Sequence, residues 1–70
     1  MSSAPPYRAL REAITGPDGK PISQRFVERE LGWKTGRLST IERGLIPGDE
    51  ERRALLGYLN ARITEQTGNQ

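Results

Sequence analysis

Glycine and proline residues divide this chain into segments that have room only for short helices. They interrupt the sequence within residues 15–21, at Gly32, at Gly44, and again at Pro47 and Gly48. Glycine favours the left-handed turn that ends a helix, and proline cannot continue one. Between these breaks there is no internal repeat and no strand-like alternation of apolar and polar residues. We therefore predict an all-α chain of four helices, or five, in one compact domain.

A domain of 70 residues buries only a small core, so its composition limits how it can be stabilised. The absence of Cys and His excludes disulfides and the usual zinc sites, and we expect neither a metal nor another cofactor. No apolar run approaches the roughly 20 residues of a membrane span. The N-terminal MSSAPP lacks the basic start and apolar core of a signal peptide, so we expect a cytoplasmic protein. The domain should span residues 6–64, between disordered tails at 1–5 and 65–70.

The first half of the chain is predicted to form two helices joined by a loop. Apolar residues recur near the N-terminus at helical spacing, at Tyr7, Leu10 and Ile14. They predict a first helix over residues 6–14, and the Gly-Pro-Asp-Gly sequence that follows suits a type I turn. Ser23 is a favourable N-cap for a second helix over Gln24–Leu31. Ile22 and Val27 have the spacing of a hydrophobic staple around that cap.

The third predicted helix has an unusual outer face. It begins near residue 34 or 35 and ends before Gly44. At about 100° per residue, Leu38 and Ile41 face inward, and Leu45 joins them if the helix continues that far. The opposite side is small, hydroxylated or cationic: Gly36, Ser39, Thr40 and Arg43. Stronger helix formers normally cover a solvated face, whereas this one suits close contact, as in the major groove of DNA.

The fourth predicted helix begins with Asp49 as its N-cap and continues to about Thr64. Its apolar residues are sufficient to close a small core: Ala54, Leu55, Tyr58 and Leu59. Leu56 and Ile63 lie toward one edge of this apolar arc and are candidates for the seam of a homodimer. Simple exposure of these two side chains is the alternative.

Positive charge is concentrated in the middle of the chain. The net charge is +2, but residues 20–45 contain six basic and three acidic residues, whereas the segments on either side are close to neutral. This distribution favours a polyanionic partner over a membrane, which selects a basic amphipathic helix. Ordinary solvated surface charge is the alternative.

Glu42 predicts a contact between the third helix and the first. On the helical wheel it falls beside the inward-facing stripe, where an unpaired carboxylate is costly. The first helix offers Arg11, and we predict a partly buried Arg11–Glu42 ion pair. The alternative is that the Glu42 side chain reaches solvent and pairs with nothing.

Three motifs occur together across the second and third predicted helices: ISQ at 22–24, Gly32 at the turn, and IERG at 41–44. This combination resembles the helix-turn-helix of the Cro and phage-repressor (Xre-type) family. The likeness extends over about residues 7–60 and is tightest over 22–44. It implies a lambda-repressor-like fold, and in that family the Glu of IERG also pairs with an Arg of the first helix.

The resemblance implies that the start of the third helix enters the major groove of double-stranded DNA. Base contacts are implied for Thr35, Gly36, Arg37 and Thr40. Arg37 is the leading candidate because a guanidinium can bond the O6 and N7 of guanine together, with a phosphate contact or plain surface charge as its alternatives. Phosphate contacts are implied for Gln24 and Arg43, and we expect the same of Lys34.

The sequence departs from the family pattern in three places. Glu28 stands where the family has a small residue, often Ala, so it should either crowd the crossing of the second and third helices or turn outward toward Lys34 or Arg37. The first loop is longer than usual, and four helices are predicted where the family commonly has five.

We therefore expect a sequence-specific DNA-binding regulator of transcription, bacterial or phage, that occupies an operator as a repressor does. The alternative is a protein-binding adaptor or antitoxin-like module on the same scaffold, which would use Leu56, Tyr58 and Ile63. An enzyme is not expected, because the chain has no His, no Cys and no glycine-rich phosphate loop before a helix. We predict that Trp33 covers the core and is not a stacking platform for bases.

Overall fold

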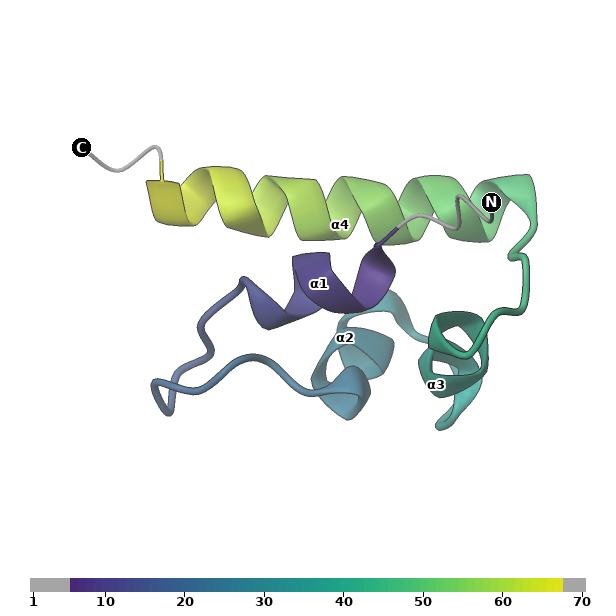
Figure 1. The fold of residues 1–70 in the computed structure, drawn as a ribbon, viewed down its shortest axis with the longest axis horizontal. Helices are drawn as coiled ribbons and strands as arrows, with labels where there is room; N and C mark the ends of the chain where they lie inside the picture. Colours follow the sequence, from purple (N-terminus) through teal and green to yellow (C-terminus); the bar gives the residue numbers. More distant parts are fainter. Residues whose placement is uncertain (1–5, 68–70) are drawn as a thin grey trace.

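Four helices make up most of the part of the chain that the structure, a computed structural model, describes, which is residues 6–67. They are α1 (Tyr7–Glu12), α2 (Gln24–Leu31), α3 (Arg37–Glu42) and α4 (Asp49–Thr67). Helix accounts for 63% of this part, and its only paired extended backbone is one isolated bridge, so the predicted all-α, four-helix domain is confirmed. α4 lies along one side, with α1 against it and α2 and α3 beyond α1 (Figure 1). None of these helices combines the length and the apolar character needed to cross a membrane.

All four helices and the α1–α2 loop contribute to one apolar core. Its buried members are Tyr7, Ile14, Ile22, Val27, Leu38, Ile41, Leu55 and Leu59. Removing such a side chain from water contributes about 1.5–3 kcal/mol to folding. Trp33 packs against the edge of this core, as predicted. The core thus brings together α1 and α4, which come from opposite ends of the described chain. α2 and α3 lie next to each other on the side of the domain away from α4 (Figure 1).

The predicted capping around α2 is confirmed. The backbone N–H of Phe26 donates to the Ser23 hydroxyl at 3.0 Å, so Ser23 is the N-cap. Ile22 and Val27 are both buried, as the hydrophobic staple requires. Gly32 ends the helix in the left-handed conformation, with a φ of 74°.

The loop between α1 and α2 folds back on itself. The N–H of Gly19 donates to the carbonyl of Gly16 at 3.0 Å, so the predicted turn is present. The carbonyl of Ile14 then accepts from the N–H of Ile22 at 3.0 Å. Because Ile14 pairs with the returning chain, α1 is shorter than the helix predicted over residues 6–14.

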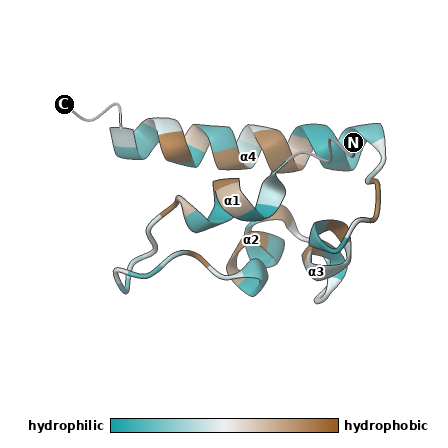
Figure 2. Cartoon of the chain, viewed as in Figure 1, coloured by the Kyte–Doolittle hydropathy of each residue, from teal (hydrophilic) through white to brown (hydrophobic). Residues whose placement is uncertain are grey.

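α3 is shorter at both ends than the sequence predicts. It begins at Arg37 because Gly36 has a φ of 94°, a left-handed conformation that interrupts the preceding turn. It ends at Glu42, and Gly44, with a φ of 131°, then redirects the chain. Leu45 was expected in the inward stripe only if the helix continued that far; because the helix ends first, Leu45 lies outside the stripe and is 41% exposed. The connector to α4 contains a hydrophobic stretch (Figure 2), and its Ile46 is 87% exposed.

The boundaries of α4 also differ from the prediction. Asp49 is the first residue of the helix and not its N-cap, and the helix continues to Thr67, past the predicted end near residue 64. The predicted disordered tail over 65–70 is therefore wrong for its first three residues. Its remainder, and the tail predicted over 1–5, lie outside the described residues.

Gln66 connects the last turn of α4 to the chain that follows α1. Its side-chain oxygen accepts a hydrogen bond from the backbone N–H of Thr15, and its amide donates to the carbonyl of Ala13 at 3.0 Å. One side chain thus joins the end of α4 to the chain just after α1.

Candidate nucleic-acid interface

The outer face of α3 is available for contact, as the helical wheel predicted. Leu38 and Ile41 are 1% and 3% exposed and point into the core. Gly36, Thr40 and Arg43 are exposed on the other side. The Thr40 hydroxyl donates to the carbonyl of Gly36 at 3.0 Å, which leaves its oxygen able to accept from a partner.

The predicted Arg11–Glu42 pair is confirmed and ties α1 to the end of α3. Nε and Nη2 of Arg11 donate to the two oxygens of Glu42 at 2.7 and 3.0 Å, and the two side chains are only 11% and 5% exposed. Nη1 of Arg11 also donates to the carbonyl of Ile22 at 2.9 Å. Burial alone favours the protonated carboxyl, but the hydrogen bonds from Arg11 and Gln24 outweigh it and hold the pKa of Glu42 below its ordinary value.

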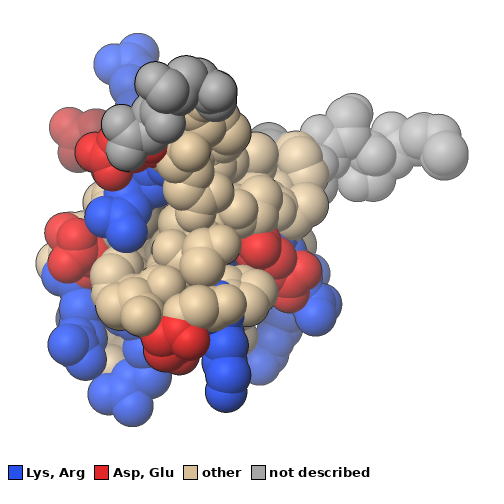
Figure 3. Space-filling view, turned by 90° about the vertical axis from the view of Figure 1, so that its left-hand side faces the viewer, with Lys and Arg blue, Asp and Glu red and all other residues tan. Residues whose placement is uncertain are grey.

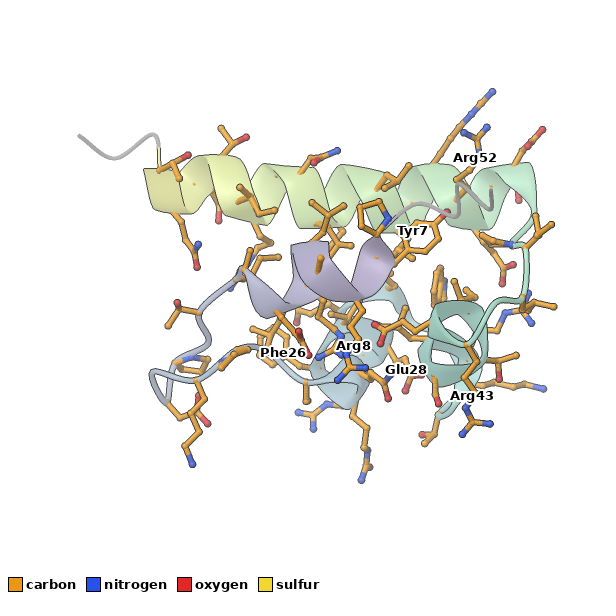
Figure 4. The ribbon with its side chains drawn as sticks, viewed as in Figure 1. Tyr7, Arg8, Phe26, Glu28, Arg43 and Arg52 are labelled. Carbon is orange, nitrogen blue, oxygen red and sulfur yellow. The ribbon has the colours of Figure 1, made fainter. Side chains whose placement is uncertain are left out.

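Gln24 and Arg43 come together at a shallow groove between α1, α2 and α3. The groove has a volume of about 460 Å³ and is lined by Arg8, Arg11, Ser23, Gln24, Ser39, Glu42 and Arg43. The Gln24 amide donates to Glu42 at 2.8 Å, so its side chain is held at the groove wall. Figure 4 shows Arg8 on α1 and Arg43 at the end of α3, both on the side of the molecule away from α4.

The other end of α3 is arranged differently. Lys34 and Thr35 are exposed in the turn before the helix, and Gly36 is at its N-cap. Arg37 is held by Glu51 of α4, with Nε donating to one carboxylate oxygen at 2.8 Å and Nη2 to the other at 2.5 Å. Hydrogen bonding from Arg37 lowers the pKa of Glu51, and the same bond raises the pKa of the guanidinium. The predicted contacts over residues 34–37 and those at Gln24 and Arg43 therefore lie at opposite ends of α3, about 9 Å apart along its axis, with Thr40 between them.

Glu28 neither crowds the helix crossing nor turns outward, so both expectations for it are wrong. It is 2% exposed, and one of its carboxylate oxygens accepts from the backbone N–H groups of Gly36 and Leu38 at 3.0 and 2.8 Å. Those N–H groups belong to the first turn of α3, which has no side-chain cap of its own. A residue of α2 thus caps α3 and fixes the angle between the two helices.

Burial of acidic residues makes the α2–α3 side more basic than the sequence suggests. Within residues 20–45, Glu28 and Glu42 are removed from the surface, and Glu30 is the exposed acid that remains. In the same segment, the exposed cations that pair with no acid among the described residues are Lys20, Arg25, Arg29, Lys34 and Arg43. Most of the basic side chains in Figure 3 accordingly lie in the lower half of the molecule, away from α4.

The three residues assigned to a protein-binding surface in the adaptor alternative are partly buried within the domain itself. Leu56, Tyr58 and Ile63 all pack against the core and are half-buried. The same holds for the dimer seam expected from Leu56 and Ile63, and a homodimer stays a prediction.

Sequence reasoning gave Glu28 the wrong role and did not assign one to Glu51. Glu28 had a usable signal, because it shares the helical spacing of Val27 and Leu31, which face the interior. Glu51 had a weaker one, its place in the first turn of α4. Its partner depends on how the α3–α4 connector returns, which local sequence does not reveal.

No family model, curated protein or solved structure matches the chain. The resemblance to the Cro and phage-repressor family therefore rests on its motifs over residues 22–44.

Proposed function

We propose that this protein is a sequence-specific DNA-binding regulator of transcription that lays the outer face of α3 in the major groove. The observation that carries the proposal is the burial of Glu28 and Glu42, which leaves the α2–α3 side with unpaired, exposed cations. Double-stranded DNA presents a dense row of phosphates that such a surface neutralises. The resemblance to the Cro and phage-repressor family supports the same assignment.

The contacts divide between the phosphate backbone and the bases. We assign phosphate contacts to Lys34, in the turn before α3, to Arg43, at the C-cap of α3, and to Gln24, which lines the same groove as Arg43. Thr40 and the turn at Gly36 offer small polar groups for base edges. Nothing approaches within 4 Å of the position a Gly36 Cβ would occupy, so the backbone there is open to a close partner.

Selection from a random duplex pool, followed by titration at several salt concentrations, tests this proposal. We expect a recovered consensus and an affinity that falls steeply with salt, because bound phosphates release counterions. Arg43→Gln should weaken binding to all duplexes and reduce the magnitude of the salt slope by about 1. Arg52→Gln is the matched control, because Figure 4 shows Arg52 on α4 pointing away from α2 and α3.

A second variant separates DNA binding from the adaptor alternative. Thr40→Glu adds a negative charge to the exposed face of α3 without entering the core, so binding should be lost while the helical circular dichroism signal stays unchanged. A wild-type protein that selects no duplex, or a Thr40→Glu variant that keeps full affinity, would overturn the proposal.

A further inference from the structure

Glu51 holds Arg37 at the start of the α3 surface. The two side chains are joined by two parallel hydrogen bonds of 2.8 and 2.5 Å, and they are 38% and 30% exposed. Glu51 is itself anchored, because one of its oxygens also accepts from the backbone N–H of Gly48 at 3.4 Å. The carboxylate therefore lies at the N-terminal end of α4, where the helix dipole favours a negative charge.

A carboxylate and the major-groove edge of guanine present the same pattern to a guanidinium. Each offers two acceptors side by side, the two carboxylate oxygens in one case and O6 and N7 in the other. Arg37 uses Nε and Nη2 for Glu51. These two N–H groups cannot bond a base edge in the same fork while the pair is intact.

We propose that Glu51 is a specificity determinant, which competes with guanine for Arg37 and weakens the preference for guanine at the base pair that Arg37 faces. The inference rests on the proposed DNA-binding function. It means that the protein reads this position through an exchange of partners, in which Arg37 leaves Glu51 as it engages a base.

The test compares Glu51→Gln with Glu50→Gln. Both variants remove one negative charge from the first turn of α4, but Glu50 is exposed and forms no hydrogen bond or ion pair with a described residue. Any general gain in attraction to phosphates is therefore shared, and only Glu51→Gln removes the ion pair and one of the two acceptors that hold Arg37. For a duplex with guanine at the position that Arg37 reads, we expect the affinity of Glu51→Gln to exceed that of Glu50→Gln about two- to five-fold. Selection from a random pool should recover guanine more often at that position with Glu51→Gln than with wild type.

An Arg37→Ala background shows whether the gain passes through Arg37. There, Glu51→Gln should raise affinity no more than Glu50→Gln does. All titrations are made at a temperature where circular dichroism shows each variant to be folded, so that loss of the α3–α4 contact is not read as loss of binding.

The outcomes separate the two claims. If wild type binds DNA but the two Gln variants gain equally, or if the excess survives in Arg37→Ala, Glu51 does not restrain Arg37 and the inference is wrong. A wild-type protein that binds no duplex overturns the proposed function instead.

Discussion

Arg11 and Glu42 connect α1 to the end of α3 through hydrogen bonds of 2.7 and 3.0 Å, across 31 positions of sequence. The amide of Gln24 donates to the same carboxylate, so three helices meet at one acidic side chain. This junction forms a wall of the groove next to Arg43. The orientation of the proposed DNA-binding helix α3 therefore depends on the negative charge of Glu42.

Stability should fall in acid because of Glu42. Its pKa in the folded protein is below the ordinary value of 4.5, so the unfolded chain takes up the proton at higher pH than the folded protein does. The stabilisation is complete well above pH 4.5 and is lost as the pH falls through the lowered pKa. Glu51, whose pKa is also lowered, adds to the loss in the same direction.

Urea denaturation of wild type and Glu42→Gln at about pH 6 and about pH 3 checks this prediction. At the higher pH the variant should be less stable by about 1.5–3 kcal/mol, the usual worth of hydrogen bonds to a charged group. At the lower pH the difference should shrink. Glu30→Gln, at an exposed acid that forms no ion pair within residues 6–67, should follow wild type. An equal loss in acid for wild type and Glu42→Gln would contradict the assignment.

Removal of the Glu28 side chain should loosen the start of α3. Glu28→Ala leaves the N–H groups of Gly36 and Leu38 without their acceptor and should cost about 2–3 kcal/mol. Glu28→Gln keeps one carbonyl oxygen, and since a single Glu28 oxygen serves both donors, it should cost less. Hydrogen exchange of the Leu38 amide is the direct measurement. Unchanged exchange in Glu28→Ala would show that the cap is dispensable.

Two glycines should respond to alanine in opposite directions. Neither Gly36 nor Gly57 has any atom within 4 Å of an added Cβ, so space does not distinguish them. Gly36 has a φ of 94°, and alanine there should destabilise the protein by about 1 kcal/mol. Gly57 is inside α4, where alanine should stabilise it by about 0.5–1 kcal/mol. Thermal denaturation of the two variants tests the pair, and a stabilising Gly36→Ala would exclude the left-handed conformation.

Gln66→Ala should free the last turn of α4. The variant removes the hydrogen bonds to the backbone of Thr15 and Ala13, both of which are exposed, so the global cost should be under about 1.5 kcal/mol. Amide exchange at residues 65–67 should accelerate, while the amides of Leu55 and Leu59 keep their protection. Gln24→Ala is a useful comparison, since it removes a glutamine contact elsewhere. Faster exchange at the core amides of Gln66→Ala would mean that Gln66 acts on the whole fold.

The features that the sequence predicts well depend on neighbouring residues or on helical spacing. Ser23 caps α2 and Gly32 ends it because both act on their own backbone. The inward stripe of Leu38 and Ile41 follows from spacing alone. The Arg11–Glu42 pair could be predicted because a carboxylate beside an inward-facing apolar stripe requires a partner.

The features that were missed depend on the path of the chain between helices. Whether Leu45 would join the core depended on the helix continuing past Gly44, and Gly44 turns the backbone instead. Glu28 finds its donors only once α2 and α3 cross. The Arg37–Glu51 pair requires α4 to return beside the start of α3, which no local pattern specifies.

The packing of α1 against α4 has a consequence for synthesis on the ribosome. Tyr7 and Ile14 are made before Leu55 and Leu59, which join them in the same buried cluster of the finished core. A nascent chain can form the α2–turn–α3 unit before it can close its apolar interior. Until α4 emerges, those early side chains remain accessible to chaperones and proteases.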